Sequence, residues 1–418
     1  MILDRYKYVY FIGIGGIGMS ALARYFNTIG KDVYGYDKEQ SVLCSQMELE
    51  GIDIHYIAHE DYIPSIIKTS NSNELLVIYT PAIAEDNIEL NFFFKKKFNL
   101  YKRSEILAII SSQLFTIAIA GTHGKTTTSA ILAHILHSLG KASTAFIGGI
   151  SKNYNTNLIF SVDANILIVE ADEYDRSFLS LKPDIAIITS VDADHMDIYK
   201  TKESLQNAFL EFALKIKKQG VLFVESSIDL DFPIPLDGKK LTYSSNEKAD
   251  FYSSNIEVSN GNMTFDMLFK DIHLEKKLFH KERDINLVMP GKHNISNAVV
   301  ASAVAYYLGA NTKQIRDSIN TFKGIERRYE LLINNSKLIF IDDYAHHPEE
   351  VSSTINTTKK LFPKRDITVV FQPHLFSRTQ DFAQEFAVSL SLADQLILLD
   401  IYPAREKPIL GVDSKMLL

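Results

Sequence analysis

The sequence is poor in cysteine and tryptophan: it has one cysteine, Cys44, and no tryptophan. A single cysteine cannot form an internal disulfide, which excludes a disulfide-stabilised secreted scaffold and fits a reducing cytoplasm. The chain also lacks an apolar run near the roughly 18 residues that a membrane-spanning helix needs. Its N-terminus carries no signal-peptide pattern, because residues 8–12 already have the character of a strand. We therefore expect a cytoplasmic protein without membrane insertion.

Positive charge is not in excess either, since 44 basic residues face 51 acidic ones and the net charge is −7. This balance gives no electrostatic reason to expect nucleic acid or an anionic membrane as a partner. Hydrophobic residues make up 46% of the chain and charged residues 23%, as in folded globular proteins. At roughly 150 residues per domain, 418 residues predict about three domains. Nothing in the sequence indicates an oligomeric state.

The dominant pattern along the chain is a short apolar run, a turn and then a helical pattern. It starts anew near residues 9, 115 and 338. Such alternation predicts βαβ units with mostly parallel sheets, an α/β fold. We place the domains at residues 1–104, 105–322 and 323–418.

One stretch, residues 251–274, breaks this pattern by alternating apolar and polar residues. Asn260-Gly261 lies between its two halves and is a strong hairpin signal. The stretch predicts an antiparallel meander appended to the second unit.

Ligands of open α/β sheets bind beyond the carboxyl ends of the strands, so the loops that follow the predicted strands are the first places to search. The first such loop, residues 13–18, fits G-x-G-x-x-G, and Asp37 ends the next strand. These features are typical of folds that bind a pyrophosphate at a helix N-terminus. The ligand can be NAD or a nucleotide-sugar, and a glycine turn that serves only close packing is the alternative.

The second loop, residues 121–126, follows a predicted strand and opens a helix with Gly124-Lys125-Thr126. Its amides would surround phosphates, Lys125 would neutralise their charge, and the Thr126 hydroxyl would bind Mg²⁺. The spacing departs from G-x-x-x-x-G-K-T, because Gly121 lies only three residues before Gly124.

Glu170 and His195 follow two further predicted strands. A carboxylate beside a phosphate-binding loop suits Mg²⁺. The alternative is an acidic turn, residues 170–175, that only caps a helix. His195 is a less natural ligand for Mg²⁺, which prefers oxygen, so chemistry alone favours a hydrogen-bonded or capping histidine.

A last polar cluster, residues 342–347 together with 372–374 and Arg378, follows two strands of the third unit. Histidines and an arginine at adjacent strand ends can bind a small carboxylate or position a nucleophile. A polar domain surface is the alternative.

In combination these motifs resemble those of the Mur ligases, in chain order and over essentially the whole chain. The motifs are Gly-Ile-Gly-Gly-Ile-Gly-Met at 13–19, Gly-Thr-His-Gly-Lys-Thr-Thr-Thr at 121–128, Glu-Ala-Asp-Glu-Tyr-Asp-Arg-Ser-Phe-Leu at 170–179, Asp-Ala-Asp-His-Met-Asp at 192–197, Gly-Lys-His-Asn-Ile-Ser-Asn-Ala at 291–298, Arg-Arg-Tyr-Glu at 327–330, Asp-Asp-Tyr-Ala-His-His-Pro at 342–348 and Phe-Gln-Pro-His-Leu-Phe-Ser-Arg-Thr at 371–379.

The resemblance implies a three-domain Mur ligase architecture. A Rossmann-like N-terminal domain would bind a UDP-sugar, a P-loop ATPase central domain would carry the meander, and a Rossmann-like C-terminal domain would bind an amino acid. The implied reaction belongs to peptidoglycan synthesis and uses ATP with Mg²⁺, or alternatively Mn²⁺. ATP would phosphorylate the lactyl carboxylate of UDP-N-acetylmuramate, and the amine of L-alanine would attack the acyl phosphate.

The family's functional residues carry over by motif. The UDP-sugar would face Gly13, Gly15, Gly16, Ile17, Gly18, Asp37, Thr80, Pro81 and His123. ATP would be held by Gly121, Thr122, His123, Gly124, Lys125, Thr126, Thr127, Asn294, Arg327 and Asp342. Tyr344, His346 and Arg378 would shape the alanine site. Thr126, Glu170 and His195 would serve the metal, a role that chemistry alone did not favour for His195. The catalytic residues would be Lys125, His195, Arg327, His346 and Arg378.

Two departures bear on the branch of the family. Several sister ligases carry a carbamylated lysine some 14 residues after the Asp-His motif, whereas this chain has no lysine until Lys215, which favours the alanine-adding branch. Some alanine-adding ligases have arginine where this chain has Leu375. The alternatives are a ligase that recycles murein peptides, a non-catalytic nucleotide-binding protein and, from the first loop alone, an NAD-dependent oxidoreductase.

The third unit, residues 323–418, is shorter than the resemblance to the Mur ligases implies, because members of that family usually continue for several tens of residues. We expect either a truncated chain or a reduced last domain, and a helix begins near Asp413-Ser414.

Overall fold

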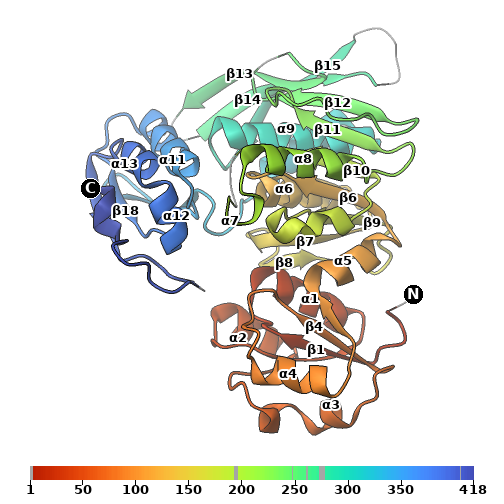
Figure 1. The fold of residues 1–418 in the computed structure, drawn as a ribbon. Coiled ribbons are helices and arrows are strands. Elements are labelled where there is room, and N and C mark those ends of the chain that lie inside the picture. The colour runs from red at the N-terminus through yellow and green to blue at the C-terminus, as the bar shows by residue number, and fades with distance from the viewer. Residues whose placement is uncertain (1–2, 193–195, 247, 260–261, 273–277, 405) are drawn as a thin grey trace.

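A computed structural model of the chain describes residues 3–192, 196–246, 248–259, 262–272, 278–404 and 406–418. The chain forms three α/β units, with the central unit between the N-terminal unit and the C-terminal unit (Figure 1). We call them the N-terminal, central and C-terminal domains. The helices of the described residues include none long and apolar enough to cross a membrane.

The N-terminal domain is built on a parallel five-stranded sheet in the order β3-β2-β1-β4-β5. Its strands are β1 (Tyr8–Ile12), β2 (Asp32–Tyr36), β3 (Asp53–His55), β4 (Leu75–Tyr79) and β5 (Leu100–Lys102). Its helices are α1 (Ile17–Thr28), α2 (Val42–Leu49), η1 (Glu60–Tyr62), α3 (Ser65–Thr69), α4 (Ile88–Lys95) and α5 (Arg103–Ser111). The strand order reverses beside β1, so the glycine loop that follows β1 lies at the switch point where such sheets bind ligands.

The central domain contains a ten-stranded sheet in the order β15-β14-β13-β12-β11-β10-β6-β9-β7-β8. The strands are β6 (Phe115–Ala120), β7 (Ser143–Ser151), β8 (Thr156–Ile159), β9 (Ile166–Glu170), β10 (Ile185–Ile188), β11 (Val221–Glu225), β12 (Lys239–Ser244), β13 (Phe251–Ser259), β14 (Asn262–Lys270) and β15 (Phe279–Leu287). The helices are α6 (Lys125–Ser138), η2 (Tyr174–Ser180), α7 (Met196–Tyr199), α8 (Lys202–Ala213), α9 (Lys292–Tyr307) and α10 (Thr312–Thr321).

Alternate residues of the central strands pack into different cores. Ile117 and Ile119 of β6 contact the apolar sides of α6, α9 and α10, whereas Ala118 and Ala120 face a cluster that includes Phe209 of α8. This second cluster continues into the N-terminal domain through α1, which packs on β7 and β8. The N-terminal and central domains therefore share one hydrophobic core.

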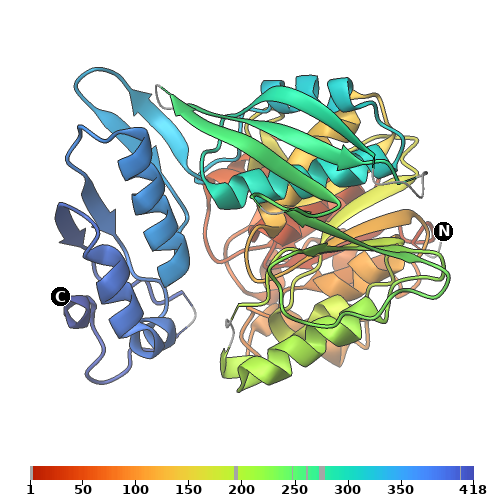
Figure 2. The ribbon, with the colours of Figure 1, turned by 90° about the horizontal axis from the view of Figure 1, so that it is seen from above.

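The C-terminal domain has a smaller core and two separate two-stranded sheets. Its elements are β16 (Glu330–Asn334), β17 (Ile339–Asp342), α11 (Pro348–Leu361), β18 (Thr368–Phe371), α12 (Phe376–Asp381), α13 (Ala383–Leu390), β19 (Gln395–Leu398) and η3 (Ser414–Leu417). Helices α11 and α13 cover one side, while Phe340, Val370 and Ile397 expose about half of their surface. Seen from above, this domain stands beside the central one (Figure 2).

The predicted three-domain α/β architecture is confirmed, and so is the meander. β13 pairs antiparallel with β14, and β14 with β15; the predicted turn at Asn260-Gly261 lies outside the described residues. The sequence pattern did not reveal that β12 pairs in parallel with β13, which joins the meander to the main sheet. The helix expected near Asp413-Ser414 is the short 3₁₀ helix η3, whose cap is Asp413. The boundaries at residues 104 and 323 stay predictions.

Candidate active site

The phosphate-binding loop joins the central strand β6 to α6, as the sequence predicts. Gly121 and Gly124 have φ values of +133° and +84°, which side chains with a Cβ rarely adopt. A Cβ on Gly121 would come within 2.0 Å of the Thr189 hydroxyl, and one on Gly124 within 2.5 Å of Asn297. Both glycines are therefore required by backbone conformation and by close packing.

Lys125 is held at the start of α6 by a buried carboxylate. Its ammonium lies 2.8 and 2.9 Å from the two carboxylate oxygens of Glu173, whose side chain is fully buried, and 2.6 Å from the carbonyl of Gly121. Burial alone would lower the pKa of Lys125, but the charges of Glu173 and Asp172 outweigh it and raise the pKa. The loop thus presents a permanent positive charge at the point where phosphates are expected.

Glu170 and Thr126 form an oxygen-lined site next to Lys125. The Thr126 hydroxyl donates to one carboxylate oxygen of Glu170 at 3.0 Å, and Ser129 and the Gly148 amide donate to the other at 3.0 and 2.6 Å. A Cβ on Gly148 would lie within 2.9 Å of both ligand groups, so only glycine leaves this space open. Hydroxyl and carboxylate oxygens are the donors that Mg²⁺ prefers, so these residues fit the metal.

The remaining predicted metal and loop residues differ in what the structure shows of them. His195 lies outside the described residues. Thr122 donates to the carbonyl of Asp192 at 3.0 Å, and the backbone amide of His123 donates to the Ser190 hydroxyl at 2.9 Å. His123, Asp192 and Glu349 offer three further ligand atoms within 4.8 Å of one another.

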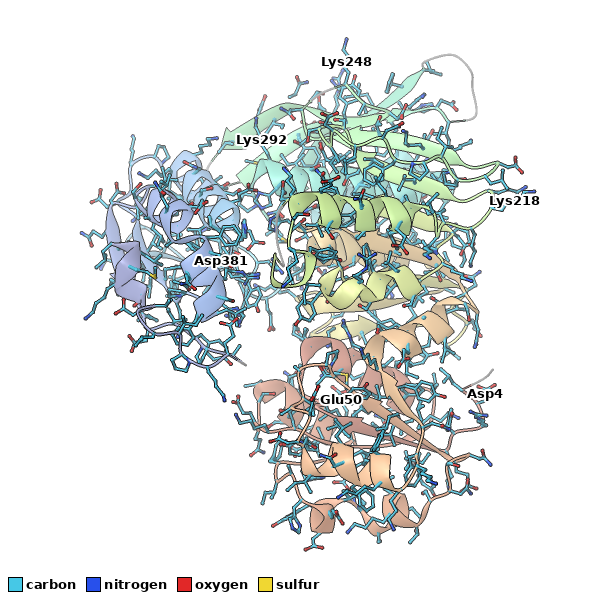
Figure 3. All side chains as sticks on the ribbon, in the orientation of Figure 1. Asp4, Glu50, Lys218, Lys248, Lys292 and Asp381 are labelled. Carbon is cyan, nitrogen blue, oxygen red and sulfur yellow. The ribbon has the colours of Figure 1, made fainter. Side chains whose placement is uncertain are left out.

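A cleft of about 380 Å³ opens from the phosphate-binding loop between the central and C-terminal domains. The predicted ATP residues His123, Gly124, Thr127 and Asn294 line it. The buried Asn294 donates to the carbonyl of Pro290 at 2.8 Å, which fixes its orientation. Lys292, labelled in Figure 3, also lines this cleft between the two domains.

Glu350, near the start of α11, connects the C-terminal domain to the phosphate-binding loop. One of its carboxylate oxygens lies 3.1 Å from Nδ1 of His123, and the other accepts the backbone amides of His346 and His347. Burial would raise the pKa of Glu350, but the hydrogen bond from His123 and the charge of His346 hold the pKa well below its usual range. A permanently ionised carboxylate therefore joins the two domains.

The residues predicted for L-alanine gather beside Glu350. The ring of Tyr344 lies 5.0 Å from that of His346, whose Nδ1 is 2.8 Å from the Tyr344 carbonyl. Arg378 lies on α12 and acts electrostatically on His346, and burial lowers the pKa of this histidine. Leu375 precedes α12 with a φ of +73°.

Arg327 and Asp342 lie on the exposed side of the same cluster. The Arg327 guanidinium is 5.1 Å from the ring centre of Tyr344 and 3.9 Å from the carboxylate of Asp342. Its side chain is 62% exposed. The cleft is lined by the next residue, Arg328, and by Asp343, so the structure does not bring Arg327 or Asp342 into the cleft lining.

The predicted UDP-sugar loop belongs to the N-terminal domain. Asp37 accepts the Gly15 amide at 2.7 Å and so holds the loop from within, a contact that its place at the end of β2 did not reveal. Thr80 lies against Gly13, where a Cβ would come within 2.4 Å of its methyl group, and the exposed Pro81 follows. Gly16 is the N-cap of α1, and Ile17 and Gly18 are its first two residues.

Sequence reasoning missed several residues that organise the site. Glu173 belongs to the quoted acidic motif, but its pairing with Lys125 is visible only in three dimensions. Glu350 follows the last histidine motif by two residues, and nothing in its local sequence connects it with His123. Ser129 and Gly148 carry no motif signal, because the fold alone brings them to Glu170.

Family models match three consecutive parts of the chain. Residues 8–114 match the Mur ligase family catalytic domain, residues 119–305 the Mur ligase middle domain, and residues 327–417 the Mur ligase glutamate ligase domain.

Individual relatives agree with these matches. The UDP-N-acetylmuramate–L-alanine ligase of Flavobacterium johnsoniae is 47% identical over all of this chain and 89% of its own, and that of Cytophaga hutchinsonii is 44% identical over all of this chain and 88% of its own. The crystal structure of the Thermotoga maritima UDP-N-acetylmuramate–alanine ligase superposes with a TM-score of 0.78 at 27% identity, covering 94% of this chain and 85% of that one. A murein peptide ligase of Psychrobacter arcticus, with a TM-score of 0.72 at 24% identity, shares the fold over 94% of this chain and 84% of its own. Because the three family models match most of the chain and the Flavobacterium and Cytophaga ligases are 44–47% identical over all of it, the chain belongs to the Mur ligase family.

Proposed function

We propose that this protein uses ATP to join L-alanine to the lactyl carboxylate of UDP-N-acetylmuramate, with UDP-N-acetylmuramoyl-L-alanine, ADP and phosphate as products. The observation that carries the proposal is the pair of neighbouring contacts in the phosphate-binding loop, in which Lys125 binds Glu173 and Thr126 binds Glu170. The chain is also 42–47% identical to UDP-N-acetylmuramate–L-alanine ligases over 99–100% of its length. The reaction belongs to peptidoglycan synthesis and, by the single cysteine, to a reducing cytoplasm.

The chemistry explains why a phosphate-binding loop is needed. A carboxylate is a poor electrophile, so a carboxylate oxygen first attacks the γ-phosphorus of ATP, and ADP leaves. The amine of L-alanine then adds to the acyl phosphate, and the tetrahedral intermediate expels phosphate and loses a proton to give the amide. Two anions must approach each other in the first step, and Lys125 screens their repulsion.

Thr126 and Glu170 are the described residues that would hold the metal. Mg²⁺, or Mn²⁺ in its place, supplies charge that offsets the repulsion between ATP and the carboxylate. Ser129 and the Gly148 amide orient Glu170 for this role by occupying its second oxygen. Gly121, Thr122, Gly124 and Thr127 bind the phosphates through the loop and the start of α6.

The C-terminal cluster would bind the amino acid. Arg378, which acts electrostatically on His346, would pair with the carboxylate of L-alanine beside the ring pair Tyr344–His346. Burial lowers the pKa of His346, which favours the neutral ring and so reduces its repulsion of an ammonium group. Arg327 and Asp342 reach the nucleotide from the same domain.

Phosphate release by the purified chain tests the proposal. ATP, Mg²⁺ and UDP-N-acetylmuramate are held constant while amino acids and the peptide L-Ala–γ-D-Glu–meso-diaminopimelate are supplied singly. Release that requires L-alanine is expected. Release with the peptide alone would instead indicate a murein peptide ligase, and ATP binding without release would indicate a non-catalytic nucleotide-binding protein.

A further inference from the structure

Arg103 belongs to none of the sequence motifs, yet its side chain lies against the glycine loop of the N-terminal domain. It begins α5 directly after β5, at the carboxyl edge of the N-terminal sheet. Its guanidinium rests on Gly18, in the first turn of α1, where a Cβ would lie 2.0 Å from Nη1 and 2.9 Å from Cζ. The last glycine of the G-x-G-x-x-G loop therefore makes room for an arginine side chain.

This guanidinium lies beside the positive end of a helix dipole. The N-terminus of α1 carries partial positive charge, no side chain caps it in the described part of the chain, and its first turn holds no acidic residue. The cap residue is Gly16, and the Gly15 amide just before it is already bound to Asp37. A cation beside a helix N-terminus is electrostatically unfavourable unless an anion joins them.

The anion present in the structure is a weak partner. Asp172, from the central domain, approaches Arg103 at 3.5 Å, and the two side chains are 40% and 30% exposed. A long, solvent-accessible ion pair of this kind contributes little, so Arg103 can exchange Asp172 for another anion at low cost.

We propose that Arg103 binds the diphosphate of the nucleotide-sugar together with the N-terminal amides of α1, and that Asp172 holds the guanidinium in place until the substrate arrives. This inference rests on the proposed function. The diphosphate, rather than the lactyl carboxylate, is the expected ligand because Arg103 touches the first turn of α1. Arginine suits this role because its planar fork matches phosphate oxygens.

Binding measurements by calorimetry on the full chain test the assignment. UDP-N-acetylmuramate, UDP-N-acetylglucosamine, which has the diphosphate but no lactyl carboxylate, and uridine are titrated into the wild type and Arg103→Ala. Loss of a charge-assisted hydrogen-bond pair weakens both UDP-sugars roughly tenfold to hundredfold and leaves uridine unchanged. Arg103→Lys recovers only part of the loss, because it keeps the charge but not the fork.

Two matched variants separate substrate binding from a merely structural role. Lys102→Ala removes a neighbouring exposed charge and should change the affinities less than threefold. Asp172→Asn removes the competitor for Arg103, so nucleotide-sugar binding should stay equal or tighten, whereas a structural ion pair would make Asp172→Asn and Arg103→Ala behave alike.

Three other outcomes would contradict either the role of Arg103 or the proposed function. Weaker binding of UDP-N-acetylmuramate alone would assign Arg103 to the lactyl carboxylate and contradict the proposal. Unchanged affinities in Arg103→Ala and Arg103→Lys, with unfolding temperatures like the wild type, would remove Arg103 from the site. A wild type that binds no UDP-N-acetylmuramate would contradict the proposed function instead.

Discussion

Lys125 shows how one residue serves both stability and the proposed chemistry. Its ammonium compensates the fully buried carboxylate of Glu173, and its place at the start of α6 directs it to the phosphate site. Removing one partner of a buried pair leaves the other charge uncompensated, at a cost of about 3–5 kcal/mol.

Lys125→Met is therefore expected to lower both turnover and the unfolding temperature. The double variant Lys125→Met/Glu173→Gln removes both charges, so it should regain the unfolding temperature without regaining phosphate release. We expect turnover at least about a hundredfold below the wild type in both proteins. Circular dichroism melting curves and phosphate release measure the two effects, and turnover restored in the double variant would contradict the role of Lys125.

Glu89 is a second buried carboxyl group, remote from the phosphate-binding loop. It accepts a 2.6 Å hydrogen bond from Tyr10 inside the N-terminal domain, and His55 lies 3.5 Å from its other oxygen. Burial raises the pKa of Glu89 from 4.5 to about 7. The folded protein thus holds this proton more tightly than the unfolded chain does, and the stability it contributes is lost as pH rises from about 4.5 through 7.

As the pH rises from 5 to 8, ionisation of this group should lower the free energy of unfolding by about 2.5 kcal/mol. Glu89→Gln keeps an acceptor for Tyr10 without the charge, so it should be more stable than the wild type at pH 8 and similar at pH 5. Glu85→Gln, at an exposed position nearby, is the control. Parallel pH dependence of the unfolding temperature in wild type and Glu89→Gln would show that Glu89 does not carry the effect.

At the scale of elements, α11 is the helix on which the C-terminal domain meets the phosphate-binding loop. Glu350 in its first turn pairs with His123, and Ser353 one turn later bonds His293 at 3.0 Å. The carboxylate also accepts two backbone amides at the helix N-terminus, where negative charge is favoured. The start of α11 therefore connects the C-terminal domain directly to the phosphate-binding loop.

Glu350→Gln should weaken this contact, because the neutral amide is a poorer acceptor for His123. Truncating one partner of a buried hydrogen-bonded charge pair costs about 2–5 kcal/mol. We expect the KM for ATP to rise and kcat to fall by roughly tenfold or more, as measured by phosphate release. Glu385→Gln, the same change in the first turn of α13, should leave both constants near their wild-type values.

Elements and their loops were predictable where the information is local. The helix ending at Gly30, the helix that opens with Lys125 and the strand that precedes Glu170 follow from apolar periodicity and glycine placement. The contacts of Lys125 with Glu173, and of His123 with Glu350, join residues 48 and 227 positions apart. Such pairs depend on the packing of whole domains, and a single sequence, analysed without an alignment, carries no signal for them.

At the scale of the whole molecule, the three domains are joined unequally. The N-terminal and central domains share a core, and Asn157 of β8 binds Arg24 at 2.6 Å and the carbonyl of Ile17 at the same distance. Arg24 also pairs with Glu50, which Figure 3 labels on the side of the N-terminal domain that faces the central one. The C-terminal domain has its own core, with six buried residues among those described, and it meets the central domain mainly through polar contacts.

This inequality predicts two thermal transitions in calorimetry. The C-terminal domain should unfold first, because its core is small and one side of its sheets stays exposed. A non-hydrolysable ATP analogue bound in the cleft contacts both sides, so at a hundredfold excess over its Kd it should stabilise the first transition by about 2.7 kcal/mol. UDP-N-acetylmuramate, bound to the N-terminal domain, should raise the temperature of the second transition and leave that of the first nearly unchanged.

A single transition that both ligands shift equally would show that the three domains unfold as one unit. In that case the polar contacts of α11 would couple the C-terminal domain to the central one as tightly as the shared core couples the other two.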